Sequence, residues 1–470
     1  MLIAVAVPSQ PFIALMVAGV LFGLGQMIIR RVAFAEANPW LVRIMTIGLV
    51  LHLLAAPAQI YVIDHFYGGI ADFVRYTHQG ALLSSNFRHF NFTLAGADVR
   101  QIVNDGSVSI ATGIVMAIVG VNQLATFLVF SWLSFIGTIF FYRAFSLTFA
   151  GGDLRRYALM VFLLPSLIFW TADVSKESIM MFALGLTAYG AAKILARRRG
   201  GFSLVVPGVA IGYYIRPNEL ILVLAGFAVA MMVPTAAARR SQGALRRLAG
   251  LTFLGLMLAF SVYLTFHYLR HGNSTLSLQQ VHDNNQGAAH GSGSSGVPYS
   301  TDPVTYPRDI YEMMFNPLPI KAHGAGQRIA ALENTVIIGL ILMSLRQLRM
   351  VPRAAFARPY VMLCAVYSAG FIYTFAALGN LGLIERERVM MLPFLLVLLC
   401  IPRAPRGSPP HYEWELRRRA RLQIRRASER LQGRSPGRGT GKTVTPAGAG
   451  RNARPVPSPL RTAPAPGRSG

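Results

Sequence analysis

Apolar runs alternate with short polar segments along most of the chain, from the N-terminus to about residue 401. A helix needs roughly 20 apolar residues to cross the hydrocarbon core of a bilayer, which is about 30 Å thick. Repeated runs of this kind are typical of a membrane-embedded helix bundle. The pattern predicts an all-α, polytopic transmembrane bundle of about eleven spans, at residues 11–29, 41–63, 121–142, 157–172, 178–195, 202–215, 219–234, 249–268, 330–345, 359–377 and 389–401.

The positions of arginine and lysine between these runs predict the orientation of the spans. Cytoplasmic loops of membrane proteins carry an excess of basic residues. The basic groups fall on one side if the N-terminus is outside and the C-terminus inside, which requires an odd number of spans. We therefore expect a multi-pass protein of the plasma (inner) membrane. The groups are Arg30-Arg31, Arg143 with Arg155-Arg156, Arg197-Arg198-Arg199, Arg239 to Arg247, Arg346 to Arg358, and the tail from Arg403.

The stretch 107–120 is apolar but short, and it contains Gly113 and Gly120. A full crossing there would place Arg143 on the outside. We therefore predict a re-entrant or interfacial helix at this point. Two long outer loops are expected, at 64–106 and 269–329.

The net charge of +26 raises the question of nucleic-acid binding, so its location matters. Residues 402–470 hold sixteen basic and three acidic residues, which is half of the net charge. Most of the rest lies in the predicted cytoplasmic loops, so no nucleic-acid partner is expected. The tail is rich in Pro, Arg, Gly and Ala and cannot bury a core, which predicts a largely disordered segment, either solvated or partly helical on anionic lipid. The chain thus divides into a transmembrane domain, 1–401, and a basic cytoplasmic tail, 402–470.

Metal and disulfide chemistry find little support in the sequence. Cys364 and Cys400 both lie inside predicted spans and are interpreted as small core residues. His271, His282 and His290 occur in a Gly/Ser-rich stretch at spacings that match no compact metal site, so no metal is expected. The apolar N-terminus lacks a basic region and a small-residue cleavage site, which predicts a retained first helix.

Thirteen charged residues at span ends or on the predicted outer side are not explained by the excess of basic residues in cytoplasmic loops. A charge at the bilayer centre costs roughly 2.5–3.5 kcal/mol on insertion scales, so such residues are paired, line a wet cavity or stay hydrated among headgroups. These come from four loops that are expected to meet at one face, and they mix both signs. That mixture suits a site where a carboxylate handles a proton and cations hold a phosphate. The residues are Asp64, Asp72, Arg75, Arg88, Asp173, Lys176, Glu177, Arg216, Glu219, Glu385, Arg386, Glu387 and Arg388.

The first outer loop carries the sharpest candidates. Gly68-Gly69 permits a tight turn just after the second span, and a helical pattern follows from Ala71 to Leu83. Within it Asp72, Arg75 and Tyr76 share one helix face at i, i+3 and i+4. Asp72 is either a functional carboxylate or an N-cap of this helix.

Two further segments present charges at the start or end of an apolar run. Lys176 lies between Asp173 and Glu177, which is consistent with either a neutralised ion triad or a point charge that binds phosphate. Arg216-Pro217-Asn218-Glu219 opens another predicted helix. Near the end of the membrane domain, acidic and basic residues alternate from Glu385 to Arg388.

The order of these elements resembles bacterial members of the GT-C superfamily, polytopic glycosyltransferases that use polyprenyl-phosphate sugars, and similar strings occur in actinobacterial membrane proteins. The resemblance covers residues 60–400. It rests on Gly68-Gly69, Asp72, Tyr76 and Gly80, on Pro165-Ser166, Phe169-Trp170 and Lys176-Glu177, on Asn316-Pro317-Leu318-Pro319 followed by Glu333, and on Asn380, Gly382, Arg386, Arg388 and Pro393.

The resemblance implies that an acid in the first outer loop acts as the catalytic base, and Asp72 is the residue at that position. The chain departs from the family in lacking an adjacent acidic pair. The implied donor is a polyprenyl-phosphate sugar, used as a co-substrate with no other cofactor, and the acceptor is a cell-envelope glycan, lipid or protein. The expected substrate-binding residues are Asp64, Arg75, Tyr76, Arg88, Lys176, Glu177, Arg216, Arg386 and Arg388.

Two alternatives remain open at this point. An O-antigen or exopolysaccharide polymerase shares the span count, the large outer loop and the outer arginines. A transporter or lipid flippase is the non-enzymatic alternative, and it would favour charges and broken helices near mid-membrane.

Overall fold

The computed structural model describes residues 10–36, 38–66, 72–97, 99, 102–149, 153–233, 252, 255, 306–321, 325–376 and 381–401. Every regular element in these ranges is a helix, which confirms the all-α prediction. The chain separates into two units, Met1–Ile424 and Arg425–Gly470, and all described residues belong to the first. The predicted span 249–268, most of the loop 269–329 and the tail 402–470 lie outside the described residues.

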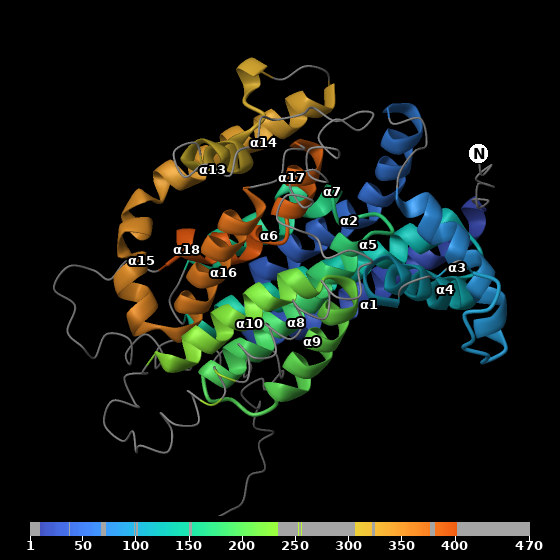
Figure 1. The fold of residues 1–470 in the computed structure, drawn as a ribbon, viewed down its shortest axis with the longest axis horizontal. Coiled ribbons are helices and arrows are strands. Elements are labelled where there is room, and N and C mark those ends of the chain that lie inside the picture. Colours follow the sequence, from blue (N-terminus) through green and yellow to red (C-terminus); the bar gives the residue numbers. More distant parts are fainter. Residues whose placement is uncertain are drawn as a thin grey trace, which may run out of the picture. The chain divides into compact units, whose positions relative to one another are not determined.

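The described elements follow one another along the chain as Figure 1 shows. They are α1 (Pro11–Glu36), α2 (Pro39–Phe66), α3 (Asp72–Arg88), η1 (Ile102–Gly106), α4 (Ser107–Val119), α5 (Gln123–Thr148), α6 (Leu154–Leu163), α7 (Pro165–Phe169), α8 (Lys176–Leu195), α9 (Phe202–Ile215), α10 (Pro217–Met232), α13 (Tyr306–Phe315), η2 (Pro319–Lys321), α14 (Ala325–Met343), α15 (Leu345–Ala357), α16 (Pro359–Phe375), α17 (Leu381–Arg388) and α18 (Leu392–Leu399).

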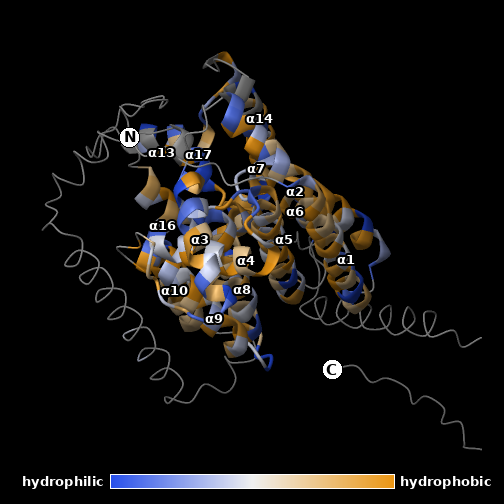
Figure 2. Ribbon diagram, turned by 90° about the vertical axis from the view of Figure 1, so that its right-hand side faces the viewer, coloured by the Kyte–Doolittle hydropathy of each residue, from blue (hydrophilic) through white to orange (hydrophobic). Residues whose placement is uncertain are grey.

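Five of these helices are long and apolar enough to cross a membrane, and a sixth results if the bent pair α14–α15 forms one span. The clearest case is α1, where Phe12 and Leu15 are each 72% exposed, and the ribbon is largely apolar (Figure 2). Exposing apolar surface to water costs roughly 25 cal/mol per Å². An apolar helix with so little protein contact is therefore suited to lipid, and the chain has the character of a membrane protein.

Four of the predicted spans, 11–29, 41–63, 121–142 and 178–195, correspond to the long helices α1, α2, α5 and α8. Three others, 202–215, 219–234 and 359–377, correspond to the shorter apolar helices α9, α10 and α16. Two predicted spans are interrupted. The span 157–172 divides into α6 and α7 at Leu164-Pro165, because proline lacks an N–H and holds the preceding residue extended. The span 389–401 is helical only over α18.

The stretch predicted to be re-entrant, 107–120, contains α4. At 1.5 Å per residue α4 is about 20 Å long, which is shorter than the hydrocarbon core. The preceding η1 adds length, so that Ile102–Val119 is long and apolar enough to cross a membrane, but it contains a kink at Asn104, where φ is 74°. The re-entrant or interfacial path of this element stays a prediction.

The centre of the bundle is α5, which packs against α1, α2, α6 and α8. Two glycines face one another where α5 crosses α8, Gly137 on α5 and Gly185 on α8. A Cβ atom on Gly137 would lie 2.5 Å from the carbonyl oxygen of Met181, and a Cβ on Gly185 would collide with the carbonyl oxygen of Gly137. Small residues at such a crossing let two backbones approach closely, which is a common device for packing helices in membranes.

Replacing Gly185 by alanine is expected to destabilise the protein by more than about 2 kcal/mol, because the new methyl group meets backbone that cannot rotate away. The melting temperature of the purified protein in detergent measures the effect. Gly19→Ala in α1 is the matched control, since nothing lies within 4 Å of its Cβ position. Equal melting temperatures for the two variants would contradict the close α5–α8 contact.

Polar contacts at one end of the bundle join helices that are far apart in sequence. Arg143 of α5 donates to Glu36 at the end of α1, at 3.1 Å. Arg156 near the start of α6 donates to the Ser344 hydroxyl, at 2.6 Å, just beyond the end of α14. The first contact joins α5 to the end of α1, and the second joins the start of α6 to the end of α14. Arg143 and Arg156 both belong to the groups that the sequence analysis assigned to the cytoplasmic side.

Candidate functional site

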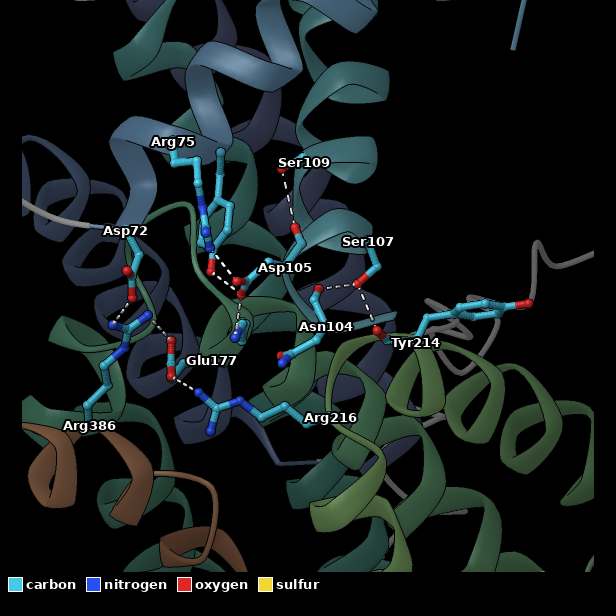
Figure 3. A network of polar contacts seen from close by, with 12 residues as sticks. Asp72, Arg75, Asn104, Asp105, Ser107, Ser109, Glu177, Tyr214, Arg216 and Arg386 are labelled. Atoms are coloured by element: carbon cyan, nitrogen blue, oxygen red, sulfur yellow. Dashed lines mark hydrogen bonds and ion pairs between the residues drawn. The ribbon is translucent and has the colours of Figure 1, made fainter. Parts of the chain in front are cut away.

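Charged residues gather where several helices begin or end. Asp72 is the first residue of α3, and Lys176 and Glu177 open α8 behind the N-cap Ser175. Arg216 separates α9 from α10, where Pro217 occupies the first helical turn. Placement at helix ends keeps these charges close to the boundary of the apolar runs. Ion pairs connect them into two groups, which become neighbours through the successive residues Lys176 and Glu177 (Figure 3). We call the two groups together the charged cluster: Arg75, Asp105 and Lys176 in the first, and Asp72, Glu177, Arg216, Glu219, Arg386 and Glu387 in the second.

Asp105 organises the outer part of the charged cluster. Its carboxylate accepts hydrogen bonds from the Arg75 guanidinium and, at 2.8 Å, from the Tyr76 hydroxyl. The Lys176 ammonium lies 2.6 Å from the same carboxylate. Two cations from different helices therefore point at one anionic position.

The backbone around Asp105 is shaped by its neighbours. Asn104 has a φ of 74°, a left-handed conformation that asparagine tolerates better than most residues. The Ser107 hydroxyl contacts the carbonyl oxygens of Asn104, at 2.6 Å, and Tyr214, at 2.8 Å, which ties η1 to the end of α9 (Figure 3). This anchoring positions Asp105 between α3 and α8.

Arg216 organises the inner part of the charged cluster. Its guanidinium pairs with Glu177, with Glu219 at 2.7 Å, and with Glu387. The side chains of Glu177 and Glu219 are completely buried. Three carboxylates around one arginine leave excess negative charge unless a second cation contributes.

Arg386 supplies that second cation and links the buried Glu177 to the exposed Asp72. One of its nitrogens lies 2.7 Å from Glu177, and the other lies 3.3 Å from Asp72 (Figure 3). The Asp72 side chain is 61% exposed, whereas that of Glu177 is buried. The cluster therefore runs from a solvent-accessible carboxylate to a buried core of ion pairs.

Asp173 lies next to the charged cluster in the turn before α8. Burial raises the pKa of its carboxyl from an ordinary 3.8 to about 6; Arg386 opposes this and Glu177 adds to it. One oxygen of the carboxyl is buried without a hydrogen-bond partner. The folded protein therefore favours the neutral form of Asp173.

This preference predicts a pH dependence of stability. Well below its ordinary pKa of 3.8, Asp173 is protonated in both the folded and unfolded states, so it costs nothing. As the pH rises to about 6, the unfolded state loses its proton first and wild-type stability falls. Asp173→Asn stays neutral, so its stability relative to wild type should rise by about 3 kcal/mol across this window. Thermal melting between pH 4 and 8 measures the difference; Asp64→Asn controls for the loss of an exposed carboxyl, and a constant difference for Asp173→Asn would contradict the prediction.

A second polar group lies apart from the charged cluster, around Arg388. This buried guanidinium donates to the carbonyl oxygen of Met314, at 2.8 Å, and to the Asn334 side chain, at 2.7 Å. Asn334 in turn donates to the carbonyl oxygen of Pro317. Burial raises the pKa of nearby Glu385 to about 7, against the influence of Arg388. Arg388 thus fastens α17 to α13 and α14.

The structure brings together seven of the ten residues that the sequence nominated, Asp72, Arg75, Tyr76, Lys176, Glu177, Arg216 and Arg386. The other three lie elsewhere. Asp64 is exposed near the end of α2, Arg88 donates to the Met116 carbonyl oxygen of α4, and Arg388 belongs to the second polar group. Among the described contacts none joins these three to the charged cluster.

The sequence interpretation missed one residue and one partner. Asp105 was not nominated, although its place in Asn104-Asp105-Gly106, a turn-forming string in the first outer loop, was a usable signal. One of the two interpretations of Lys176 was an ion triad with Asp173 and Glu177. It pairs instead with Asp105, while Glu177 points to the two arginines, because successive residues of a helix project about 100° apart.

No group of three or more His, Cys, Asp or Glu side chains within the described ranges is arranged to hold a metal ion. The histidines of the Gly/Ser-rich stretch lie outside those ranges. Comparison with protein-family models, curated proteins and solved structures finds no match for this chain.

Proposed function

We propose that the chain is an integral membrane glycosyltransferase that moves a sugar from a polyprenyl-phosphate donor to a cell-envelope acceptor on the extracytoplasmic face. The observation that carries this proposal is the position of Asp72. It is the most exposed carboxylate of the charged cluster, and it lies 3.3 Å from a cation, Arg386. A base that an acceptor hydroxyl can reach, next to fixed positive charge, is what sugar transfer from a phosphate donor requires.

The proposed reaction uses the two parts of this arrangement in one step. The Asp72 carboxylate takes the proton of the acceptor hydroxyl while that oxygen forms a bond to the anomeric carbon. The bond between the anomeric carbon and the phosphate oxygen breaks, and its electron pair leaves with the polyprenyl phosphate. Arg386, Lys176 and Arg75 are the cations placed to neutralise the departing phosphate. Arg216 is enclosed by carboxylates and Arg388 lies in the second polar group, so both have a supporting role in this proposal.

Asp105 has a specific place in the proposal. Its carboxylate holds Arg75 and Lys176 toward a common point before any phosphate arrives, which lowers the cost of ordering them during binding. A phosphate that bound there would replace one anion by another. Asp105 is thus a positioning residue that keeps the cations convergent.

The proposed topology has about eleven spans, with the N-terminus outside, the C-terminus inside and 107–120 re-entrant, in the plasma (inner) membrane. Support comes from the segregation of contacts along the bundle. Arg143 of α5 contacts the end of α1 and Arg156 near the start of α6 contacts the residue after α14, whereas the charged cluster forms at the starts of α3, α8 and α10. The positive-inside tendency places the first group in the cytoplasm.

The direct test compares cell-envelope glycans of the wild type, a deletion strain and the deletion strain that carries Asp72→Asn. Loss of one glycan decoration in the deletion strain, restored by wild type and not by the variant, is the expected result. Uniform shortening of a glycan chain would favour a polymerase. Unchanged glycans in the deletion strain would contradict both enzymatic proposals.

One observation favours a second candidate, a proton-coupled transporter. The charged cluster holds five carboxylates to four cations, and burial raises the pKa of the Asp173 carboxyl beside it to about 6. Buried acids that change protonation near neutral pH are typical of proton relays in transporters. Proton uptake by proteoliposomes that contain the purified protein, without consumption of any lipid-linked sugar, would favour this candidate over sugar transfer.

A further inference from the structure

The elbow between α14 and α15 lies outside the charged cluster and has no part in the proposed reaction. The two helices meet at Ser344 and are bent by 66° relative to one another, so that α15 turns away from the direction of α14 (Figure 1). The bend is held by Arg156 of α6, whose guanidinium donates to the Ser344 hydroxyl at 2.6 Å, while that hydroxyl bonds back to the Leu340 carbonyl oxygen. The elbow is therefore fixed by side-chain contacts.

One side of α15 packs onto the protein. Gln347 and Ala355 are buried, and Leu348, Val351 and Ala354 pack against the core, at positions that repeat with the period of a helix. The neighbours on that side are α16 and α18. The other side is left for the surroundings of the protein.

That outer side combines positive charge with exposed apolar surface. Arg346, Arg349 and Arg353 are exposed and share one face, at i, i+3 and i+7. Next to them Leu345 is 45% exposed and Phe356 is 68% exposed. The sequence has no acidic residue between Glu333 and Glu385, so nothing along this stretch neutralises the arginines.

The elbow also contains a pocket of about 390 Å³. Its lining residues are Leu342, Met343, Leu345, Arg346 and Arg349. Three apolar side chains and two guanidinium groups at the end of an apolar helix match the boundary between acyl chains and headgroups, where apolar and positively charged groups are needed together.

We infer that this elbow is a binding site for an anionic phospholipid, with the phosphate held by Arg346 and Arg349 and the acyl chains against Leu342, Met343 and Leu345. Arginine forms bidentate hydrogen bonds with phosphate oxygens, and each basic residue near a membrane surface contributes to the attraction. The proposed topology places the elbow on the cytoplasmic side, where anionic lipids are concentrated. The site does not depend on the chemistry at Asp72.

The test uses the full-length protein, purified in detergent and depleted of lipid, with bound lipid measured by native mass spectrometry. The probes are palmitoyl-oleoyl phosphatidylglycerol and phosphatidylcholine with the same acyl chains. The wild type is expected to prefer phosphatidylglycerol. Arg346→Gln combined with Arg349→Gln should weaken that binding about thirtyfold, given about 1 kcal/mol for each basic residue.

The matched control is Arg198→Gln combined with Arg199→Gln, which removes the same charge from the exposed turn between α8 and α9 and should leave lipid binding unchanged. Arg346→Lys combined with Arg349→Lys keeps the charge and should keep most of the binding. Binding by this variant would show that the Gln variant binds less because it lacks the charge, and not because a substitution at these two positions unfolds the protein. Equal binding of both lipids, equal loss in both Gln variants, or loss in the Lys variant would overturn the proposal. Displacement of phosphatidylglycerol by inorganic phosphate alone would also overturn it, in favour of a site for the free anion.

Discussion

Asp72→Asn is expected to lower sugar transfer by about 10²–10⁴-fold, the range that one well-placed general base contributes. Asparagine has nearly the same shape as aspartate and cannot accept the proton of an acceptor hydroxyl. The measurement is the rate of sugar incorporation into envelope glycans by membranes that contain equal amounts of each protein. The proposed mechanism requires this loss, because the other carboxylates of the charged cluster are buried or already hold two or three donors.

The variant is expected to fold normally. Asp72 is 61% exposed, and its single described ion pair is with Arg386, which is 21% exposed and keeps Glu177 as a partner in the variant. The loss of this pair is therefore expected to cost about 1 kcal/mol. Asp64→Asn is the matched control, since it removes an exposed carboxyl of α2 that has no described contact with the charged cluster. Full transfer by a well-folded Asp72→Asn protein, or equal loss in both variants, would remove Asp72 from the proposed role.

The helices were predictable because a helix that contacts lipid must be apolar over its whole length. The apolar character of α1, α2, α5 and α8 is continuous, so hydropathy alone located them. The break at Leu164-Pro165 is a local backbone effect inside an apolar run, and a hydropathy window averages over it. Only α18, Leu392–Leu399, is helical within the predicted span 389–401. The apolar composition of this segment does not indicate the residues at which its helix begins and ends.

The convergence of charges was also predictable, but their pairing was not. Charges excluded from lipid collect at span ends, and spans that alternate in direction bring those ends to two faces. Which acid meets which base depends on how helices rotate and pack, and Arg216 and Glu387 are 171 residues apart. Asp105 shows the same limit, because Asn104-Asp105-Gly106 indicates a turn in the sequence but does not indicate that the turn directs the carboxylate toward α3 and α8.

Arg216→Met is expected to destabilise the protein by about 3–5 kcal/mol, the cost of breaking a buried pair so that uncompensated charge remains. The Arg216 side chain is 11% exposed, and it neutralises three carboxylates. Of these, Glu177 retains Arg386 as a partner, whereas Glu219 and Glu387 have no other described ion pair. The melting temperature and the yield of folded protein in detergent measure the loss.

A rescue experiment separates this structural role from substrate binding. If Arg216 acts by neutralising its neighbours, then Glu219→Gln and Glu387→Gln in the Arg216→Met background should restore most of the stability, because a whole ionic network can be replaced at little cost when no charge is left behind. The rescued triple variant should also transfer sugar, since Arg75, Lys176 and Arg386 are intact. Restored stability without transfer would instead mean that Arg216 contacts the donor phosphate, as the sequence alone predicted. A triple variant as unstable as Arg216→Met would contradict the neutralising role, because the shape of the guanidinium and not its charge would then hold α8, α10 and α17 together.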